Sequence, residues 1–112
     1  MNLYAEYIKE REGIDLLEKD YGFCTYSIVS DINSIYLIDT YVKKDKRREG
    51  FASKFFDEVI EIGKDSGCCK IIGGFCLSTN GWQKGKNVLK ANGFKYLSKD
   101  KNTNMIFVFK EI

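Results

Sequence analysis

A basic loop and an amphipathic helix separate two apolar, strand-like runs in the middle of the chain. The two runs are residues 35–42 and 68–77, and both are rich in apolar side chains. Between them, apolar residues recur every three or four positions over residues 50–65, the spacing of a helix with one buried face. Two strands joined by a helix need a crossover connection, which places them in one sheet with the helix packed against it.

Further helices and strands surround this central unit. Residues 3–19 place apolar side chains among many charges, which predicts an amphipathic helix weakened at Gly13. The predicted helices are residues 3–19, 50–65 and 82–91, and the predicted strands are residues 21–29, 35–42, 68–77, 94–97 and 105–109. The order α-β-β-α-β-α-β-β predicts an α/β (α+β) fold, with a single mixed sheet flanked by helices.

The length of the chain suits one domain. At 112 residues, roughly 65% of the unfolded surface can be buried, so we expect a single domain over residues 1–112. No apolar run reaches the roughly 18 residues that a membrane span needs, and no membrane partner is expected. Residues 1–6 lack the basic start and apolar stretch of a secretion signal, which favours a cytoplasmic protein.

Four cysteines raise the question of a metal site or a disulfide. They are Cys24, Cys68, Cys69 and Cys76. They form no C-x-x-C pair and the chain has no histidine, so no metal is expected. They lie in apolar strand-like segments, where a free cysteine behaves as a small hydrophobic residue. We therefore predict reduced cysteines in the core.

Charge is unevenly distributed along the chain. Residues 1–40 hold three Lys/Arg and eight Asp/Glu, a net −5, whereas residues 41–112 hold fifteen and eight, a net +7. The two halves either face partners of opposite sign or are solvated surface. The lysines of the second half occur singly, no nucleic-acid motif accompanies them and the pI is about 8.3, so no nucleic-acid partner is expected.

The loop before the middle helix has the features of an anion site. Five Lys/Arg and one Asp occupy residues 43–48, directly after the strand ends at Val42. The helix begins at about Gly50, so its first backbone N–H groups have no helical partner, and its terminus adds about half a positive charge. Gly50 and Ala52 are too small to keep a phosphate away from that backbone. A basic surface loop that only caps the helix is the alternative interpretation.

Three stretches of the chain resemble the GNAT superfamily of N-acetyltransferases. The run Arg47-Arg48-Glu49-Gly50-Phe51-Ala52 is similar to the (Arg/Gln)-x-x-Gly-x-(Gly/Ala) loop with which these enzymes bind acyl-coenzyme A. Residues 35–42 resemble the strand before that loop, notably in diamine acetyltransferases, and residues 89–94 resemble the last helix and its Asn-Gly-Phe exit. The resemblance spans residues 34–94. In size the chain is similar to the small viral acetyltransferases that modify a host protein lysine.

This resemblance implies acetyl-CoA as the cosubstrate. The backbone N–H groups from Arg48 to Ser53 would bind the pyrophosphate, and the strand ending at Val42 would pair with the pantetheine arm like an added strand. The implied cofactor-binding residues are Thr40, Tyr41, Val42, Arg47, Arg48, Glu49, Gly50, Phe51, Ala52 and Ser53. No metal is implied, because the amine attacks the thioester directly while a strand N–H holds the oxyanion.

The catalytic residues follow the family pattern only in part. The tyrosine that family members commonly use as acid corresponds to Leu89. Asp39 matches the Asp of a Glu-Asp pair in diamine acetyltransferases, and it would either orient a cationic amine and accept its proton or be a solvated carboxylate. Ser78, with Thr79 and Asn80 beside it, is the candidate replacement hydroxyl. Tyr36 and Tyr41 either line the acceptor cleft or belong to the core.

Two functional hypotheses follow. The first is an acetyltransferase acting on a primary amine, either a polyamine-like small molecule or a protein lysine, attracted by the acidic N-terminal part. The alternative is a catalytically impaired CoA-binding or protein-interaction module, motivated by Leu89 and by the short length. A small sheet with exposed edges also favours a homodimer.

Overall fold

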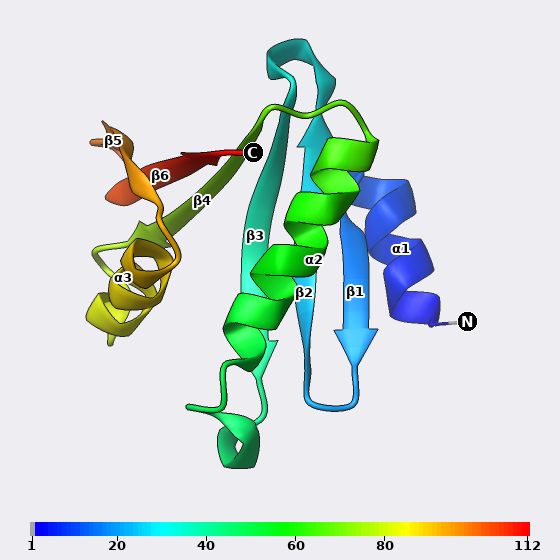
Figure 1. Ribbon diagram of the computed structural model, residues 1–112, viewed down its shortest axis with the longest axis horizontal. Coiled ribbons are helices and arrows are strands. Elements are labelled where there is room, and N and C mark those ends of the chain that lie inside the picture. The colour runs from blue at the N-terminus through cyan, green and yellow to red at the C-terminus, as the bar shows by residue number, and fades with distance from the viewer. Residues whose placement is uncertain (1) are drawn as a thin grey trace.

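A six-stranded mixed sheet runs through the computed structural model, which describes residues 2–112 (Figure 1). Its helices and strands are α1 (Leu3–Glu12), β1 (Asp15–Lys19), β2 (Gly22–Val29), β3 (Ser34–Val42), α2 (Phe51–Asp65), β4 (Lys70–Cys76), α3 (Trp82–Ala91), β5 (Lys95–Asp100) and β6 (Met105–Glu111). The strands lie in the order β1-β2-β3-β4-β6-β5, and only β3 and β4 pair in parallel among the described strands. The predicted fold class and its mixed sheet are confirmed.

The N-terminal segment differs from its prediction. All the predicted elements are present in the predicted order, but the helix expected over residues 3–19 ends at Glu12, and β1 is an additional strand. Gly13 adopts φ 68° and its N–H donates to the carbonyls of Ile8 and Lys9, which is a left-handed helix terminus. The chain then turns back, and Leu17 lies opposite Cys24 in an antiparallel pair. A strong terminating glycine therefore overrides the helical spacing that continues beyond it.

Helix α2 supplies much of the core. Phe55, Phe56 and Val59 are buried on the face that it turns toward the sheet. Full burial of a side chain of this size stabilises a fold by about 1.5–3 kcal/mol. Gly63 allows the close approach, because a Cβ there would lie 2.9 Å from the Ile35 Cγ2. The predicted boundaries of the two later helices are confirmed to within one residue.

The cysteine prediction is confirmed in part. All four cysteines are free. Cys24 and Cys68 are buried in the core, but Cys69 is exposed and Cys76 is half-buried. Cys69 lies in the connection before β4 and Cys76 lies at the last position of that strand, so neither is covered as a central strand residue would be.

The parallel contact between β3 and β4 is short. It consists of the pairs Ser34↔Lys70, Ile35↔Ile71 and Tyr36↔Ile72. Beyond Tyr36 the two strands separate, as the diverging ribbons in Figure 1 show. The rest of β3 is therefore left without a strand partner on the side of β4, and this opening divides the sheet into two halves, β1-β2-β3 and β4-β6-β5.

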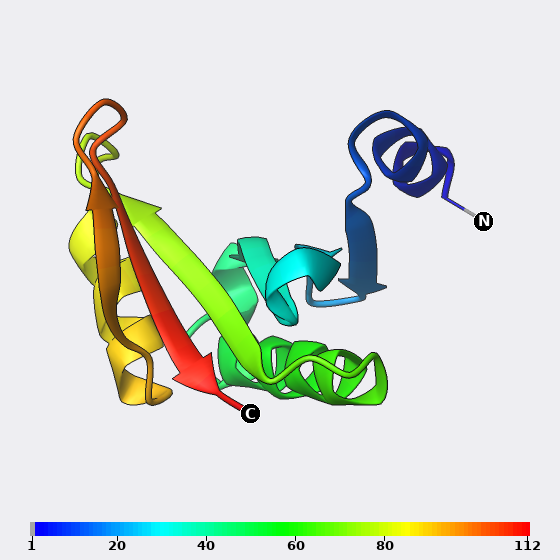
Figure 2. The same ribbon diagram turned by 90° about the horizontal axis from the view of Figure 1, so that it is seen from above.

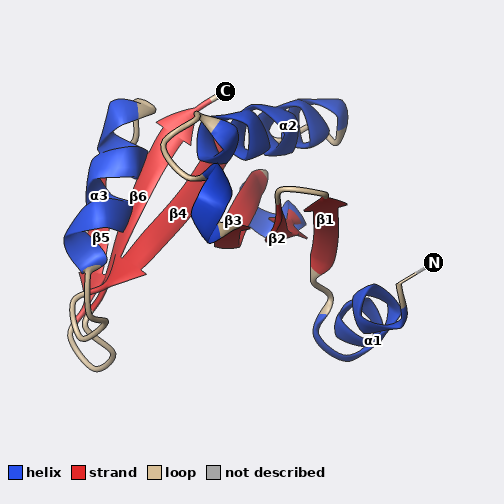
Figure 3. Cartoon of the chain, turned by 90° about the horizontal axis from the view of Figure 1, so that it is seen from below, coloured by secondary structure: helices blue, strands red, loops and turns tan. Residues whose placement is uncertain are grey.

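The helices do not cover the sheet equally. Helix α2 packs on β2 and β3, and α3 packs on β4. Helix α1 lies on the other side of the sheet from α2, next to β1 at its edge (Figures 2 and 3). Over the β2–β3 part of that other face the views show no α-helix of the described residues, and the short 3-10 helices Ser30–Ile32 and Lys44–Lys46 lie at the two ends of β3. No helix within residues 2–112 is long and apolar enough to cross a membrane.

Candidate active site

A cleft of about 890 Å³ occupies the opening between the two halves of the sheet. Strand β3 forms one wall, β4 and α3 form the other, and the N-terminal turn of α2 closes one end. The lining residues include Leu37, Ile38, Asp39, Thr40, Tyr41, Val42, Lys46, Arg47, Arg48, Gly50, Phe51, Ala52, Ser53, Gly74, Phe75, Cys76, Thr79, Trp82, Lys84 and Leu89. The cleft thus combines strand edges, a helix terminus and side chains from both halves.

Unpaired backbone N–H groups face this cleft at the start of α2. Across the described chain, no N–H from Arg47 to Ser53 donates to another protein group. The turn before the helix is tight, with φ 66° at Arg48 and φ 81° at Gly50, and Gly50 offers no side chain to cap the helix. Free amides at a helix N-terminus bind anions, because the helix dipole adds positive charge there.

Positive side chains surround these amides. Among the described lining residues the cations are Lys46, Arg47, Arg48 and Lys84, and the one acid is Asp39. The first turn of α2 contains no acidic residue. Arg47 is held at the end of β3, where its Nε donates to the Val42 carbonyl at 2.9 Å and its guanidinium lies 5.6 Å from the Tyr41 ring centre. This end of the cleft is therefore suited to a polyanionic group.

A β-bulge in β3 changes which face of the sheet its side chains point to beside the cleft. The register shifts from Tyr26↔Leu37 to Thr25↔Asp39, which leaves Ile38 as the extra residue. Opposed residues point to the same face of a sheet, so Leu37 lies on the α2 side and Asp39 on the other side. Residues of both orientations therefore line the cleft.

Two glycines of β4, on the opposite wall of the cleft, allow neighbouring groups to pack closely. A Cβ at Gly74 would lie 3.0 Å from the Ile106 carbonyl oxygen and 3.1 Å from the Met105 Cε. A larger residue there would displace β6 or enter the opening. The position next to it, Gly73, lets α3 approach, since a Cβ would lie 3.3 Å from the Leu89 Cδ2.

Asp39 stands at the edge of the opening. Its backbone N–H donates to the Thr25 Oγ1 at 3.1 Å, while its exposed carboxylate has no hydrogen-bond or ion-pair partner among residues 2–112. Burial, and secondarily the charge of Asp39, raise the pKa of the Tyr36 hydroxyl. The opening thus carries a free carboxylate, whereas Tyr36 is half-buried and does not line the cleft.

The end of β4 presents a thiol and hydroxyls. The N–H of Ser78, together with the hydroxyls of Thr79 and Ser78, lowers the pKa of the Cys76 thiol. The Ser78 hydroxyl accepts a hydrogen bond from the Asn104 Nδ2 at 3.1 Å and is not part of the cleft lining, whereas Cys76 and Thr79 are. The thiol was not among the residues chosen from the sequence, although its position at a strand end was a usable signal.

Most of the residues expected to bind the cofactor come together. Nine of them line the cleft: Thr40, Tyr41, Val42, Arg47, Arg48, Gly50, Phe51, Ala52 and Ser53. Glu49 is exposed and does not line the cleft. Leu89 lines it from α3 and is 7% exposed, so this position packs in the core as well as facing the cleft. The stacked rings of Phe75 and Trp82, 5.8 Å apart, are lining residues that the sequence did not indicate.

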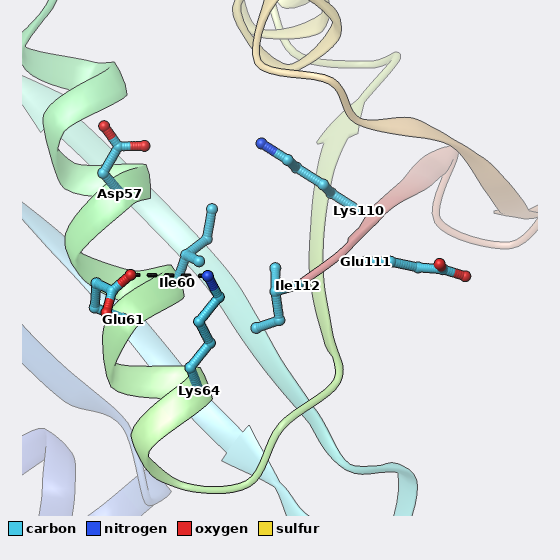
Figure 4. Close-up of a pocket in the computed structure, with 7 residues that line it drawn as sticks. All are labelled: Asp57, Ile60, Glu61, Lys64, Lys110, Glu111 and Ile112. Atoms are coloured by element: carbon cyan, nitrogen blue, oxygen red, sulfur yellow. Dashed lines mark ion pairs between the residues drawn. The ribbon is translucent and has the colours of Figure 1, made fainter.

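A second, smaller cavity lies elsewhere on the molecule. It has a volume of about 290 Å³ between the C-terminal part of α2 and the end of β6 (Figure 4). Its charges are mixed, and Lys64 pairs with Glu61 at 3.8 Å. It contains no helix N-terminus, so the large cleft is the better candidate for chemistry.

The comparisons with known proteins agree with this geometry. The family model of the acetyltransferase (GNAT) family matches residues 4–94. A GNAT-family protein from Desulfovibrio desulfuricans superposes with a TM-score of 0.78 at 13% identity, over 96% of this chain and 77% of that one. No curated protein matches the chain by sequence.

Two similar structures were solved with coenzyme A bound. The PaiA N-acetyltransferase of Thermoplasma acidophilum has a TM-score of 0.74 and 20% identity, over 98% of this chain and 69% of that one. An acetyltransferase of Bacillus subtilis has a TM-score of 0.69 and 13% identity, over 99% and 86%. At these identities the structures show a shared fold, and the family match covers most of the sequence. The chain therefore belongs to the GNAT family of acetyltransferases, which transfer an acetyl group from acyl-coenzyme A.

Proposed function

We propose that this chain transfers the acetyl group of acetyl-CoA to a primary amine, either of a small polyamine-like molecule or of a protein lysine. The observation that carries the proposal is the set of unbonded amides from Arg47 to Ser53, at the mouth of a cleft that passes between β3 and β4. The amides suit a diphosphate, and the passage connects the two faces of the sheet. Cosubstrate and acceptor would then approach one another from opposite sides.

The cleft fits the chemistry of coenzyme A. The amides of Arg48 to Ser53 would bind the pyrophosphate, and Lys46 and Lys84 lie on the same cleft to add positive charge. The β3 edge from Leu37 to Val42, which has no strand partner on the β4 side, would pair with the amide groups of the pantetheine arm. For that pairing the Arg47 side chain must leave the Val42 carbonyl, to which it is bonded at 2.9 Å.

On the opposite side, Asp39 would receive the acceptor. Transfer forms a C–N bond and breaks the C–S bond of the thioester. An amine that arrives as ammonium must lose one proton before it attacks and a second as the amide forms, and one proton must reach the sulfur. The free carboxylate of Asp39 would attract the ammonium form of the amine and take its proton directly or through water. An unpaired N–H of β3 beside the opening would hold the oxyanion.

The proton for the departing thiolate needs a donor other than Leu89. That side chain is aliphatic and 7% exposed. Thr79 lines the cleft, whereas the predicted donor Ser78 would first have to turn away from Asn104. A thiol is a modest leaving group with a pKa near 8.5, so water can also serve.

Loss of catalysis is the competing proposal, because Leu89 replaces the usual acid. It is tested by calorimetric titration with acetyl-CoA, followed by measurement of thiol release with butylamine, spermidine and lysine-containing peptides. Binding with release that depends on the amine supports the enzyme. Binding without release in any mixture supports a CoA-binding module, and absence of binding contradicts both.

A further inference from the structure

Two aromatic rings and one carboxylate form a row on the uncovered face of β3. Register places Tyr36 opposite Ser27, Asp39 opposite Thr25 and Tyr41 opposite Phe23. These residues share the face turned away from α2, because Cys24 and Tyr26, which alternate with them on β2, lie opposite Thr40 and Leu37. The order along the strand is therefore ring, carboxylate, ring.

Each of the two rings is backed by a second ring from a neighbouring part of the sheet. Tyr36 meets Phe107 of β6 edge-on at 6.1 Å between centres, and Tyr41 stacks on Phe23 of β2 at 5.5 Å. Tyr41 is 45% exposed, with the Arg47 guanidinium 5.6 Å from its ring centre, and the other three rings are half-buried. No described α-helix lies over this part of the face (Figures 2 and 3). Uncovered aromatic surface of this kind marks a contact site for another molecule.

The spacing of the row matches an extended polypeptide. Tyr36 and Tyr41 are five residues apart with one residue in the bulge, which leaves about four strand steps, or roughly 14 Å. In an extended peptide the side chains two before and two after a given residue point to the same side as that residue. Those two side chains are also about four steps apart, so they reach both ring pairs when the central side chain points at Asp39.

Building on the proposed acetyl transfer to an amine, we propose that the acceptor is a lysine in an extended polypeptide segment with apolar residues at positions −2 and +2. The lysine Nζ passes Asp39 into the opening beside Ile38 and Gly74, where the cleft crosses the sheet. The two apolar side chains pack on the pairs Tyr36–Phe107 and Phe23–Tyr41. The lysine is thereby positioned by its neighbours in the peptide.

Charge argues against a free polyamine at this face. A polyamine carries several positive charges on a bare chain and needs an acid for each of them. Of the described strand residues on this face from β2 to β4, Asp39 is the one acid. Glu18 belongs to β1, with β2 between it and β3, and it already accepts a hydrogen bond from the Asn2 Nδ2 at 2.8 Å. One carboxylate between rings suits one lysine among apolar neighbours.

Peptides of identical composition provide the sharpest test. One end-capped peptide carries Leu-Ser-Lys-Ser-Leu between glycines, and its control carries Ser-Leu-Lys-Leu-Ser, which moves the leucines to positions −1 and +1. We expect kcat/KM for the first peptide to exceed that of the control about tenfold, and to exceed that of spermidine or Nα-acetyl-lysine amide about a hundredfold. Equal values for the two peptides, or spermidine as the better substrate, would overturn the proposal.

A variant pair tests the surface itself. Phe23→Ala removes a ring that does not line the cleft, and Tyr96→Ala removes a ring that is 64% exposed on β5. We expect only Phe23→Ala to raise the KM for the first peptide, about tenfold, while acetyl-CoA affinity and turnover of Nα-acetyl-lysine amide stay unchanged. Thermal unfolding checks both variants, and Phe23→Leu should restore part of the peptide preference. Equal effects of the two alanine variants contradict the proposal.

Binding measurements distinguish failure of this peptide proposal from failure of the proposed acetyl transfer on which it rests. If acetyl-CoA binds but no amine is acetylated, fluorescence anisotropy of labelled peptides still reports whether the face prefers leucines at −2 and +2. If acetyl-CoA does not bind, both proposals fall. Sedimentation gives a further outcome, since a dimer that Phe23→Ala dissociates would assign this face to a second copy of the chain.

Discussion

The two sides of the opening between β3 and β4 differ in the chemical groups that they present. On the side of α2, the features are main-chain amides, a strand edge and a helix terminus, with basic side chains around them. On the opposite side, the features are the rings of Tyr36 and Tyr41 and the carboxylate of Asp39. Backbone features tolerate many sequences, whereas a row of side chains depends on the residue type at each of its positions. The first side suits a constant cosubstrate and the second a particular acceptor.

Replacing Asp39 by Asn should separate the two sides most strongly. The change keeps the shape but removes the charge that would attract the amine and take its proton. We expect kcat for an amine to fall by about 10²–10⁴-fold, the usual contribution of a general base, while the Kd of acetyl-CoA stays the same. Steady-state kinetics and calorimetry measure the two quantities. A matching control is Asp57→Asn on α2, an exposed carboxylate without an ion pair among residues 2–112. A large change in Kd would mean that the sides are not independent.

Glycine substitutions at the two ends of α2 address the backbone side alone. Gly50 and Gly67 have φ 81° and 82°, and a Cβ at either would meet nothing within 4 Å. Valine should therefore cost each variant about 1–2 kcal/mol of stability through the left-handed conformation. Only Gly50→Val should also weaken acetyl-CoA binding, by about 100-fold, since about 3 kcal/mol corresponds to the loss of one or two charged hydrogen bonds. Equal affinities in the two variants would remove the loop from the binding site.

Cysteine alkylation compares the cleft with the core. The pKa of Cys76 is lowered, first by the N–H of Ser78, so its thiolate and its reaction with iodoacetamide should appear at lower pH than those of N-acetylcysteine. Burial raises the pKa of Cys24 to about 11, and this thiol should stay unmodified in the folded protein. Acetyl-CoA at ten times its Kd should slow labelling of Cys76 about tenfold and leave the exposed Cys69 unaffected. Mass spectrometry of peptides reads all three sites.

The smallest expected difference in acetyl-CoA affinity is between alanine variants of two lysines on α3. Lys84 lines the cleft, whereas Lys86 lies outside it with its Nζ 5.9 Å from the Trp82 ring centre. Lys84→Ala should weaken acetyl-CoA binding by about 1.5–5-fold, the value of an exposed ion pair, and the effect should shrink with added salt. Lys86→Ala should change neither. Equal losses would indicate a diffuse positive field in place of a local contact.

The parts of the molecule that follow from local pattern were predictable. The spacing of Phe51, Phe55, Val59 and Ile62 predicted α2, and the basic loop before it predicted the free amides. Strand β1 was missed because Leu16 and Leu17 are strong helix formers among charges, and pairing with β2 decides their conformation.

The acceptor side depends on events that no short stretch encodes. The bulge at Ile38 and the end of the β3–β4 contact at Tyr36 arise from how the strands twist and pair. These two events decide that Asp39 and Tyr41 reach both the cleft and the outer face. Residue types alone therefore suggested Asp39, but not the ring pairs on either side of it.

The short contact between β3 and β4 affects how well the protein resists proteolysis. Among the described residues, three residue pairs between β3 and β4 join one half of the sheet to the other. A ligand that fills the cleft touches both halves and adds contacts where the sheet has fewest, which disfavours the opened forms that proteases attack. Resistance to degradation would then rise and fall with the supply of acetyl-CoA.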